Sequence, residues 1–385
     1  MSLYGQRMNF RDFKSGVLKQ QYEYRSFSPA LVNQTWIWDD PKINTLLEEA
    51  TRSLGELNGL SLIIPDIDLF IRMHVLREAQ TSSRIEGTVT TMAEAVMPRR
   101  EDIDPEKRDD WQEVQNYVDA MNSAIVKLET LPLSNRLLRD THAILMRGVR
   151  GQHKTPGEFR RSQNWIGGAT LADASFIPPH HEELPDLLSD LEKFWHNATI
   201  DVPHLIRVGI SHYQFETIHP FQDGNGRIGR LLITLYLVSK GLLAKPCLYL
   251  SEFFEKHRGE YYDALTQVRV SNDLAHWVKF FLVAVNTTAT RGIGTFRKIV
   301  QIQKEVDDLL PQFGKRSANA RQLVQLLYRR PRLTARAASE ELGLSIVTSD
   351  KLLVDFVGLG LLVEKTGRRR GRIYEFQRYF RLFVD

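Results

Sequence analysis

Apolar residues recur at helical spacing along most of this chain, and that periodicity restricts its fold more than any other feature of the sequence. The first such segment places Leu46, Ala50, Leu54 and Leu57 on one face of a helix that begins near Pro41. Further helices are predicted over residues 67–83, 111–128, 134–146, 184–195, 203–216, 227–240, 260–268 and 274–288. The body of the protein is therefore predicted to be mainly α.

Two stretches lack this periodicity. Residues 1–40 hold scattered aromatic side chains, and we predict that they form an extended arm packed on the body. Residues 151–179 are rich in glycine, proline and threonine with isolated apolar positions, which is typical of a β-hairpin or flap. A length of 385 residues favours two or three domains, and we expect them to cover residues 1–110, 111–295 and 296–385.

The composition excludes several classes of protein. Apolar residues make up 42% of the chain and charged residues 25%, which is the balance of a soluble globular protein. Cys247 is the one cysteine, so an internal disulfide and a cysteine-based zinc cluster are excluded. No apolar stretch has the length of a membrane span, and polar residues interrupt the first segment where a signal peptide would need an apolar core. We expect a cytoplasmic protein with no membrane partner.

Basic residues are concentrated at the C-terminal end. The whole chain carries a net charge of +4, whereas residues 316–385 hold 14 Lys and Arg against 7 Asp and Glu, a balance of +7. Helices are predicted there over residues 320–328, 335–342 and 345–356, with Thr334 and Ser345 as caps. Two strand-like segments follow and flank a basic turn. This order of elements is that of a winged helix-turn-helix domain.

Such a domain makes DNA a possible partner of residues 316–385. The third helix would present four side chains to the bases, namely Ser345, Thr348, Ser349 and Lys351. The wing would contact phosphates through Arg368, Arg369, Arg370 and Arg372. Asp350 and Asp355 oppose this interpretation because they would repel phosphate, and winged helices can also dock proteins. Both partners remain open at this point.

The densest set of chemically active residues lies in residues 217–230, Thr-Ile-His-Pro-Phe-Gln-Asp-Gly-Asn-Gly-Arg-Ile-Gly-Arg. The glycine-containing loop precedes a predicted helix, and free N–H groups at a helix N-terminus favour an anion. Gly224 and Gly226 let a phosphate approach the main chain. Arg227 and Arg230 offer guanidinium groups, which suit phosphate oxygens.

A carboxylate and an imidazole complete this candidate site. Asp223 would repel a bare phosphate, so its place beside an anion site favours a Mg²⁺ ion between them. His219 lies just upstream and can accept a proton from a nucleophile. The alternative is a capped helix with a surface loop. It leaves the base, the carboxylate, two glycines and two arginines within twelve residues unexplained.

The pattern His-Pro-Phe-x-Asp-Gly-Asn-Gly-Arg-x-x-Arg resembles the signature of the Fic family at each defining position, and the order of elements is similar over residues 30–290. The resemblance implies a Fic-type helical bundle with a β-hairpin flap. It also implies transfer of AMP from ATP to a Ser, Thr or Tyr hydroxyl of a target protein or of the protein itself. His219 would be the general base, Asp223 the Mg²⁺ ligand and Arg230 the γ-phosphate anchor. The anion hole would comprise Gly224, Asn225 and Gly226, with Arg227 steadying the phosphates.

An upstream segment with the pattern Ser-x-x-x-Glu-Gly, formed by Ser82, Glu86 and Gly87, resembles the inhibitory motif of the same family. Taken alone, it is an ordinary helix end followed by glycine. The resemblance implies that Glu86 pairs with Arg230, takes the place of the γ-phosphate and leaves ATP in an unproductive pose. It also makes a homodimer an expectation by analogy.

Two further segments carry the resemblance. Ile166, Gly167 and Gly168 lie in the predicted flap and would approach the nucleotide, while the flap would hold the target by main-chain pairing. Tyr261 and Tyr262 resemble tyrosines that house the adenine. Some relatives carry an asparagine seven or eight positions later, where this chain has Val-Arg. The alternative for both tyrosines is ordinary packing on a helix.

Two functions therefore compete. In the first, the protein is an adenylyltransferase whose C-terminal domain recruits a target. In the second, it is a DNA-binding regulator whose Fic body senses or modifies a partner. The intact signature favours ATP and adenylylation over transfer of other phosphate-containing groups.

Overall fold

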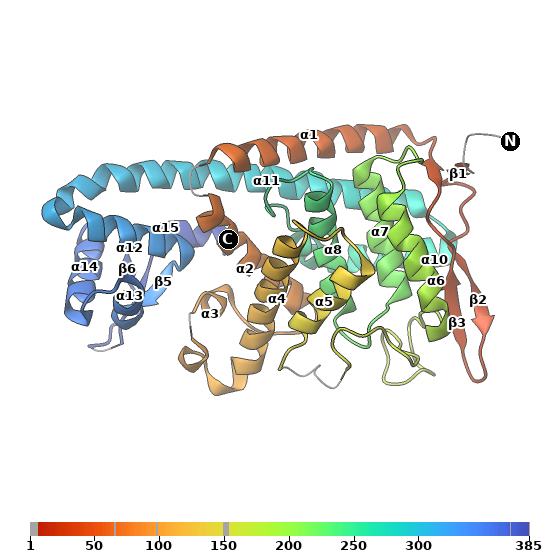
Figure 1. Ribbon diagram of the computed structural model, residues 1–385, viewed down its shortest axis with the longest axis horizontal. Helices are drawn as coiled ribbons and strands as arrows, with labels where there is room; N and C mark the ends of the chain where they lie inside the picture. The colour runs from red at the N-terminus through yellow and green to blue at the C-terminus, as the bar shows by residue number, and fades with distance from the viewer. Residues whose placement is uncertain (1–6, 65–66, 98, 149–153, 370, 385) are drawn as a thin grey trace.

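The computed structural model describes residues 7–64, 67–97, 99–148, 154–369 and 371–384. Within these ranges the protein is mainly helical, with three small sheets, so the prediction of a mainly α fold is confirmed (Figure 1). No helix among them is both long enough and apolar enough to cross a membrane.

Most of the predicted helices are present, with ends that differ by a few residues. They are α1 (Pro41–Ile63), α2 (Ile67–Ile85), α4 (Arg108–Lys127), α5 (Asn135–Leu145), α6 (Leu184–His196), α7 (His204–Ile218), α8 (Asn225–Ser239) and α10 (Arg258–Ser271). Short elements that were not predicted separate them: α3 (Met92–Ala95), α9 (Ser251–Lys256) and the 3-10 turns η1 (Arg100–Asp102), η2 (Pro105–Lys107) and η3 (His181–Glu183). Helices α7 and α8 are buried along nearly their whole length and form the centre of the core.

Helix α11 is much longer than predicted. It runs from Leu274 to Leu309, whereas the prediction ended at residue 288, and the expected boundary between residues 295 and 296 lies inside it. Buried residues at 293, 296, 299, 302 and 306 continue its apolar face. Helix α1 lies along α11 (Figure 1). A β-carbon at Gly292 would lie 3.0 Å from Leu57 of α1, so this glycine permits close packing of the two helices rather than ending α11.

The N-terminal arm contains two small sheets. Strand β1 (Arg7–Asn9) pairs in parallel with β4 (Thr35–Ile37), and β2 (Gly16–Gln20) pairs antiparallel with β3 (Arg25–Pro29). The ring of Trp36 lies 5.7 Å from Phe10 and 5.0 Å from Phe13, and all three side chains are buried. These rings thus pack against one another within the arm, while the Val32 N–H donates a hydrogen bond of 2.7 Å to Asp190 of α6 and ties the arm to the body.

The predicted flap is a looped segment with a single antiparallel bridge rather than a hairpin with paired strands, among the residues described from 154 onward. The bridge joins Ile166 and Phe176 through main-chain hydrogen bonds of 2.9 and 3.1 Å. Gly167 and Gly168 have φ of 70° and 72°, and the carboxylate of Asp173 accepts the next two N–H groups, which are therefore unavailable for a ladder. This corrects the expectation of a β-hairpin.

The C-terminal elements follow the predicted order. They are η4 (Leu310–Arg316), α12 (Ser317–Arg329), β5 (Arg332–Thr334), α13 (Ala335–Leu342), α14 (Ile346–Gly358), β6 (Val363–Glu364), β7 (Ile373–Glu375), α15 (Gln377–Phe380) and η5 (Arg381–Phe383). The Thr334 and Ser345 side chains cap α13 and α14 as predicted. Strand β5 was not predicted, and the sheet has the order β5-β7-β6. Arg370 lies outside the described residues.

This C-terminal region packs directly on α2. The ring of Phe70 lies 5.0 Å from Tyr328 and 6.1 Å from Tyr379, and His74 lies 5.0 Å from Phe383. Helix α2 therefore has one end against the C-terminal elements, while its other end leads to Glu86.

Candidate active site

Helix α7 ends at Ile218, and the residue that caps it, His219, has the left-handed conformation φ 51°, ψ 60°. This conformation is uncommon for a residue other than glycine and needs support from its surroundings. Arg160 and Asn164 provide it, since both donate hydrogen bonds to the carbonyl of His219, at 3.0 and 3.2 Å. Two residues of the flap segment thus hold the backbone of His219 in this conformation.

The imidazole of His219 is neutral at physiological pH. Burial lowers its pKa to about 4, and the positive charges of Arg160 and Arg269 act in the same direction. Its Nδ1 atom is buried and faces the main chain of Glu216, so a hydroxyl has to reach the other ring nitrogen, Nε2. The Nε2 atom of a neutral imidazole can accept a proton from a hydroxyl.

The loop between α7 and α8 is held by its own Asn225 and by His142 of α5. Asn225 accepts a hydrogen bond from the N–H of Phe221 and donates one to its carbonyl, each at 2.8 Å. His142 stacks on the ring of Phe221 at 3.9 Å and contacts the Asp223 carbonyl at 3.0 Å. The Asn225 side chain is therefore occupied in supporting the loop. An anion at this position would be bound by main-chain N–H groups instead.

Asp223 fits a metal ligand by its position. Its side chain is half exposed beside the N-terminus of α8. Oδ1 accepts the Gly224 N–H at 2.6 Å and lies 4.0 Å from the guanidinium of Arg227. Mg²⁺ is commonly bound through one carboxylate together with substrate phosphates, and this arrangement suits that mode.

Arg227 points into the body of the protein. Its Nη1 atom lies 3.1 Å from Glu113 Oε2 on α4, and Nη2 contacts the sulfur of Met146 at 3.5 Å. Burial raises the pKa of Glu113, and the charge of Arg227 opposes that rise. Glu113 could not be selected from the sequence, because it lies 114 positions before Arg227 and no motif links the two.

Arg230 is the most enclosed charge of the site. Its Nε donates to Ser82 Oγ at 2.8 Å, and its Nη2 donates to the Ser82 carbonyl at 3.0 Å and to Glu86 Oε1 at 2.7 Å. Burial works to raise the pKa of Glu86, but the charge and hydrogen bond of Arg230 outweigh it, and the pKa is lowered. The three residues that the sequence associated with one another are thus in direct contact.

Gly226 makes room for this contact. A β-carbon at that position would lie 2.3 Å from Glu86 Oε1 and 2.9 Å from Arg230 Nη1. The sequence suggested a role for this glycine towards phosphate only. Its lack of a side chain is needed for the approach of Glu86 as well.

Glu216 is a site neighbour that the sequence analysis missed. It lies one turn before His219 on α7 and is buried, and burial raises its pKa to about 7, with the charge of Arg230 opposing the rise and that of Glu86 adding to it. Its Oε1 atom would lie 2.2 Å from a β-carbon at Gly229, so this glycine of the signature lets α7 and α8 pack closely. Glu216 lies within a largely apolar helix and belongs to no motif, so the sequence alone did not indicate a place for it in the site.

The predicted adenine and flap residues lie in different surroundings. Tyr261 is buried, with its hydroxyl 2.8 Å from His212 Nε2, whereas Tyr262 is 41% exposed. Ile166 is half-buried, and Gly167 and Gly168 are exposed on the flap. Their contact with a nucleotide stays a prediction.

Profiles of two family regions match this chain. The Fic/DOC family N-terminal profile covers residues 44–126, and the Fic/DOC family profile covers residues 132–237, which include the whole α7–loop–α8 unit. The chain is a Fic/DOC family protein. The predicted membership of this family is thereby confirmed. The signature residues lie in the loop between α7 and α8 and in the first turn of α8.

Relatives of this Fic/DOC protein include curated adenylyltransferases. Protein adenylyltransferase Fic of Aedes aegypti is 29% identical over 209 residues, 51% of this chain and 37% of the relative. The protein of the same name from Culex quinquefasciatus is 31% identical over 205 residues, with the same coverage of 51% and 37%. The chain thus spans little more than a third of the length of these relatives.

A solved structure shares the fold. The crystal structure of a Fic family protein from Desulfovibrio desulfuricans matches with a TM-score of 0.56 and 23% identity, covering 89% of this chain and 98% of that one. At this identity the likeness concerns the fold alone, which is the mainly helical Fic fold with small sheets.

Proposed function

We propose that this Fic/DOC protein is a protein adenylyltransferase, which transfers AMP from ATP to a Ser, Thr or Tyr hydroxyl of a target protein or of itself. The observation that carries the proposal is the α7–loop–α8 unit. It joins a neutral imidazole at His219, a glycine loop at a helix N-terminus and a buried guanidinium at Arg230.

In the reaction, the target hydroxyl oxygen attacks the α-phosphorus of ATP. The bond from that phosphorus to the bridging oxygen breaks, pyrophosphate leaves, and the imidazole of His219 takes the hydroxyl proton. Main-chain N–H groups at the start of α8 stabilise the phosphates, and Arg230 binds the γ-phosphate. Asp223 would hold Mg²⁺, which when bound offsets the negative charge of the phosphates.

We further propose that the resting protein is autoinhibited. Arg230 already has three hydrogen bonds to Ser82 and Glu86, so its guanidinium is engaged by protein acceptors. A γ-phosphate has to replace Glu86 at Nη2 before ATP adopts a productive pose. Residues 67–87 would then act as the inhibitory element, and its displacement would be the activating step.

Labelling with two forms of ATP tests the transfer. The Glu86→Gly protein, incubated with a cell lysate, is expected to produce covalent label from ATP radiolabelled at the α-phosphate and none from ATP labelled at the γ-phosphate. Label from the γ-phosphate alone would indicate a kinase. If neither form of ATP labels a protein, the proposed transfer activity is contradicted.

We propose DNA binding through a winged-helix domain in residues 316–385 as a second candidate function. Arg368 and Arg369 favour it, because both are exposed in the turn between β6 and β7 and have no partner among the described residues. Of the base-reading set, Ser349 is buried. Its neighbour Asp350 pairs with Arg372 of the predicted wing at 2.6 Å. The candidate contact surface is therefore the wing rather than the whole of α14.

Filter retention of random duplex DNA tests this candidate. Wild-type protein is expected to retain DNA at low salt, with an affinity that falls as salt rises. The double change Arg368→Glu and Arg369→Glu should abolish retention, while Arg297→Glu, a change of one exposed arginine on α11, should not. Equal retention by both variants would contradict a wing contact.

A further inference from the structure

The C-terminal elements, from α12 to η5, contact the chain at two places that flank the inhibitory glutamate. The first contact is with the start of α2. The ring of Phe70 lies 5.0 Å from Tyr328 of α12 and 6.1 Å from Tyr379 of α15. One turn further along α2, the ring of His74 lies 5.0 Å from Phe383 of η5. Apart from His74, these rings are at most 3% exposed, so the first contact is a buried aromatic cluster.

The second contact is with the chain that follows the inhibitory glutamate. Arg332 of β5 donates a hydrogen bond of 3.1 Å to the carbonyl of Ala93 in α3. Glu340 of α13 forms an ion pair with Arg99, directly before η1. Ile373 of β7 packs against a small buried cluster, which consists of Met97, Ile103 and Trp111. The segment that carries the glutamate is therefore attached to the C-terminal elements at both of its ends.

Between these two contacts the chain presents Glu86 to Arg230. Helix α2 is continuous, and at a rise of about 1.5 Å per residue its 19 residues span about 28 Å. A shift of its first turns therefore moves its last turn as well. The N–H groups of Glu86, Gly87 and Thr88 each donate to a carbonyl of that last turn, at 3.0, 3.0 and 3.2 Å. The place of Glu86 thus depends on what holds α2 and the segment after it.

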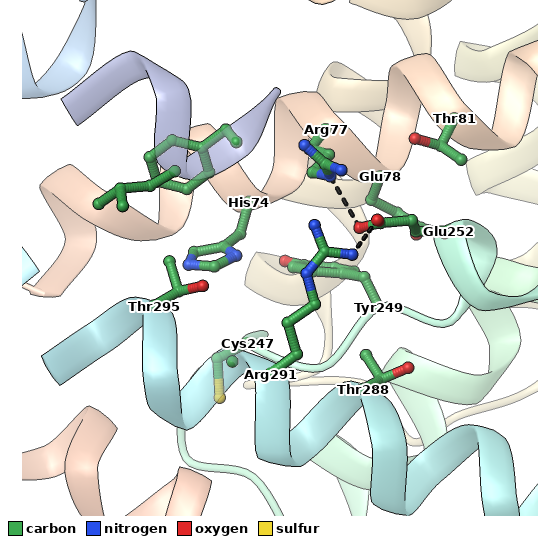
Figure 2. A pocket seen from close by; sticks show the side chains of 13 residues that line it. His74, Arg77, Glu78, Thr81, Cys247, Tyr249, Glu252, Thr288, Arg291 and Thr295 are labelled. Atoms are coloured by element: carbon green, nitrogen blue, oxygen red, sulfur yellow. Dashed lines mark hydrogen bonds and ion pairs between the residues drawn. The ribbon is translucent and has the colours of Figure 1, made fainter. Parts of the chain in front are cut away.

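The contact at the start of α2 is not packed as a finished core would be. A cavity of about 50 Å³ lies between α2, α11 and η5, and Figure 2 shows His74 and Thr295 on its wall. The Nε2 atom of His74 and the hydroxyl oxygens of Tyr328 and Tyr379 are buried, with no hydrogen-bond partner among the described residues. Burying such atoms unpaired is unfavourable, and water can pair with them when the contact opens. The contact can therefore open more readily than a fully paired core of the same size.

From these contacts we propose that the C-terminal elements hold Glu86 on Arg230, and that their separation from α2 releases it. While both flanks are attached, the segment between them has little conformational freedom, and the carboxylate stays 2.7 Å from the guanidinium. Once the contact with α2 opens, the ion pair alone has to order the segment, and a γ-phosphate displaces it more readily. The effect on AMP transfer rests on the proposed function, whereas the hold on Glu86 does not.

Hydrogen–deuterium exchange of the full chain tests this hold without any transfer reaction. Phe383→Ala removes the ring that packs on His74. The N–H groups of residues 86–88 are then expected to exchange at least about fivefold faster than in wild type, the lower end of the range for coupled sites. The rate of labelling from α-labelled ATP should rise as well and stay below that of Glu86→Gly. If Glu86→Gly itself yields no label, the proposed transfer fails, and the exchange rates still decide this inference.

Phe313→Ala is the matched control, because Phe313 packs on Phe356 of α14, 4.9 Å away, rather than on α2. Its exchange at residues 86–88 should equal that of wild type. Equal exchange in Phe383→Ala and Phe313→Ala would overturn the proposal. If Phe383→Ala does not fold, Glu340→Arg replaces it, since it sets two positive charges against each other at Arg99 and should also speed the exchange. Exchange in Glu340→Arg equal to that of the control would then overturn the proposal.

Discussion

Glu86→Gly is expected to raise the rate of label transfer from α-labelled ATP by about 10- to 100-fold. The change removes the acceptor 2.7 Å from Arg230 Nη2 and leaves that donor to a γ-phosphate. A hydrogen bond to a charged group contributes about 1.5–3 kcal/mol, which corresponds to about 10- to 100-fold in rate. The initial rate of self-labelling, at equal concentrations of folded protein, measures the effect.

A second ion pair of α2 supplies the control. Arg84 lies 3.5 Å from Glu255 of α9, so Glu255→Gln also removes a carboxylate that faces this helix. It leaves the contacts of Arg230 unchanged, and its rate should equal that of wild type. If Glu86→Gly labels no faster than Glu255→Gln, the contact between Glu86 and Arg230 does not limit the reaction.

Folded concentration has to be matched because the same change affects stability. Arg230 is 2% exposed, and removing its partner leaves a buried charge with only the two acceptors of Ser82. Glu86 itself is 37% exposed, so solvent screens part of the loss. A modest fall in the free energy of unfolding is therefore expected together with the rise in rate.

The sequence predicted the parts of this fold that depend on local pattern. Helix periodicity located α2, α7 and α8, and the caps at Thr334 and Ser345 followed from side chains that accept neighbouring N–H groups. The full length of α11 was missed, since glycines near residue 292 weaken a helical pattern when the packing partner is unknown. Strand β5 is three residues long and forms only by pairing with β7, about 40 positions later.

The candidate site was predictable where it is continuous in sequence. Residues 219–230 form one loop and one helix start, so their proximity follows from the chain itself. The side chains that support this unit could not be predicted in the same way, because His142, Arg160 and Glu113 reach it from other elements. The cavity between α2, α11 and η5 is lined by residues more than 200 positions apart, and no local sequence pattern predicts that they lie close together.

His219→Ala in the Glu86→Gly protein is expected to lower the transfer rate by about 10²- to 10⁴-fold, the usual contribution of a positioned general base. The imidazole is neutral at physiological pH and its left-handed backbone is fixed by Arg160 and Asn164. Alanine retains the loop but has no group to take the hydroxyl proton. Initial rates with α-labelled ATP at saturating concentration measure the loss.

Two measurements separate a lost base from a lost site. ATP binding by the double variant should remain close to that of Glu86→Gly, since the α8 N-terminus and Arg230 are unchanged. His276→Ala removes an exposed histidine near the start of α11 and should leave the rate unaltered. Transfer that persists in the His219 variant would assign the proton to another acceptor. The buried carboxylate of Glu216, one turn away with a pKa raised to about 7, would then be the next residue to change.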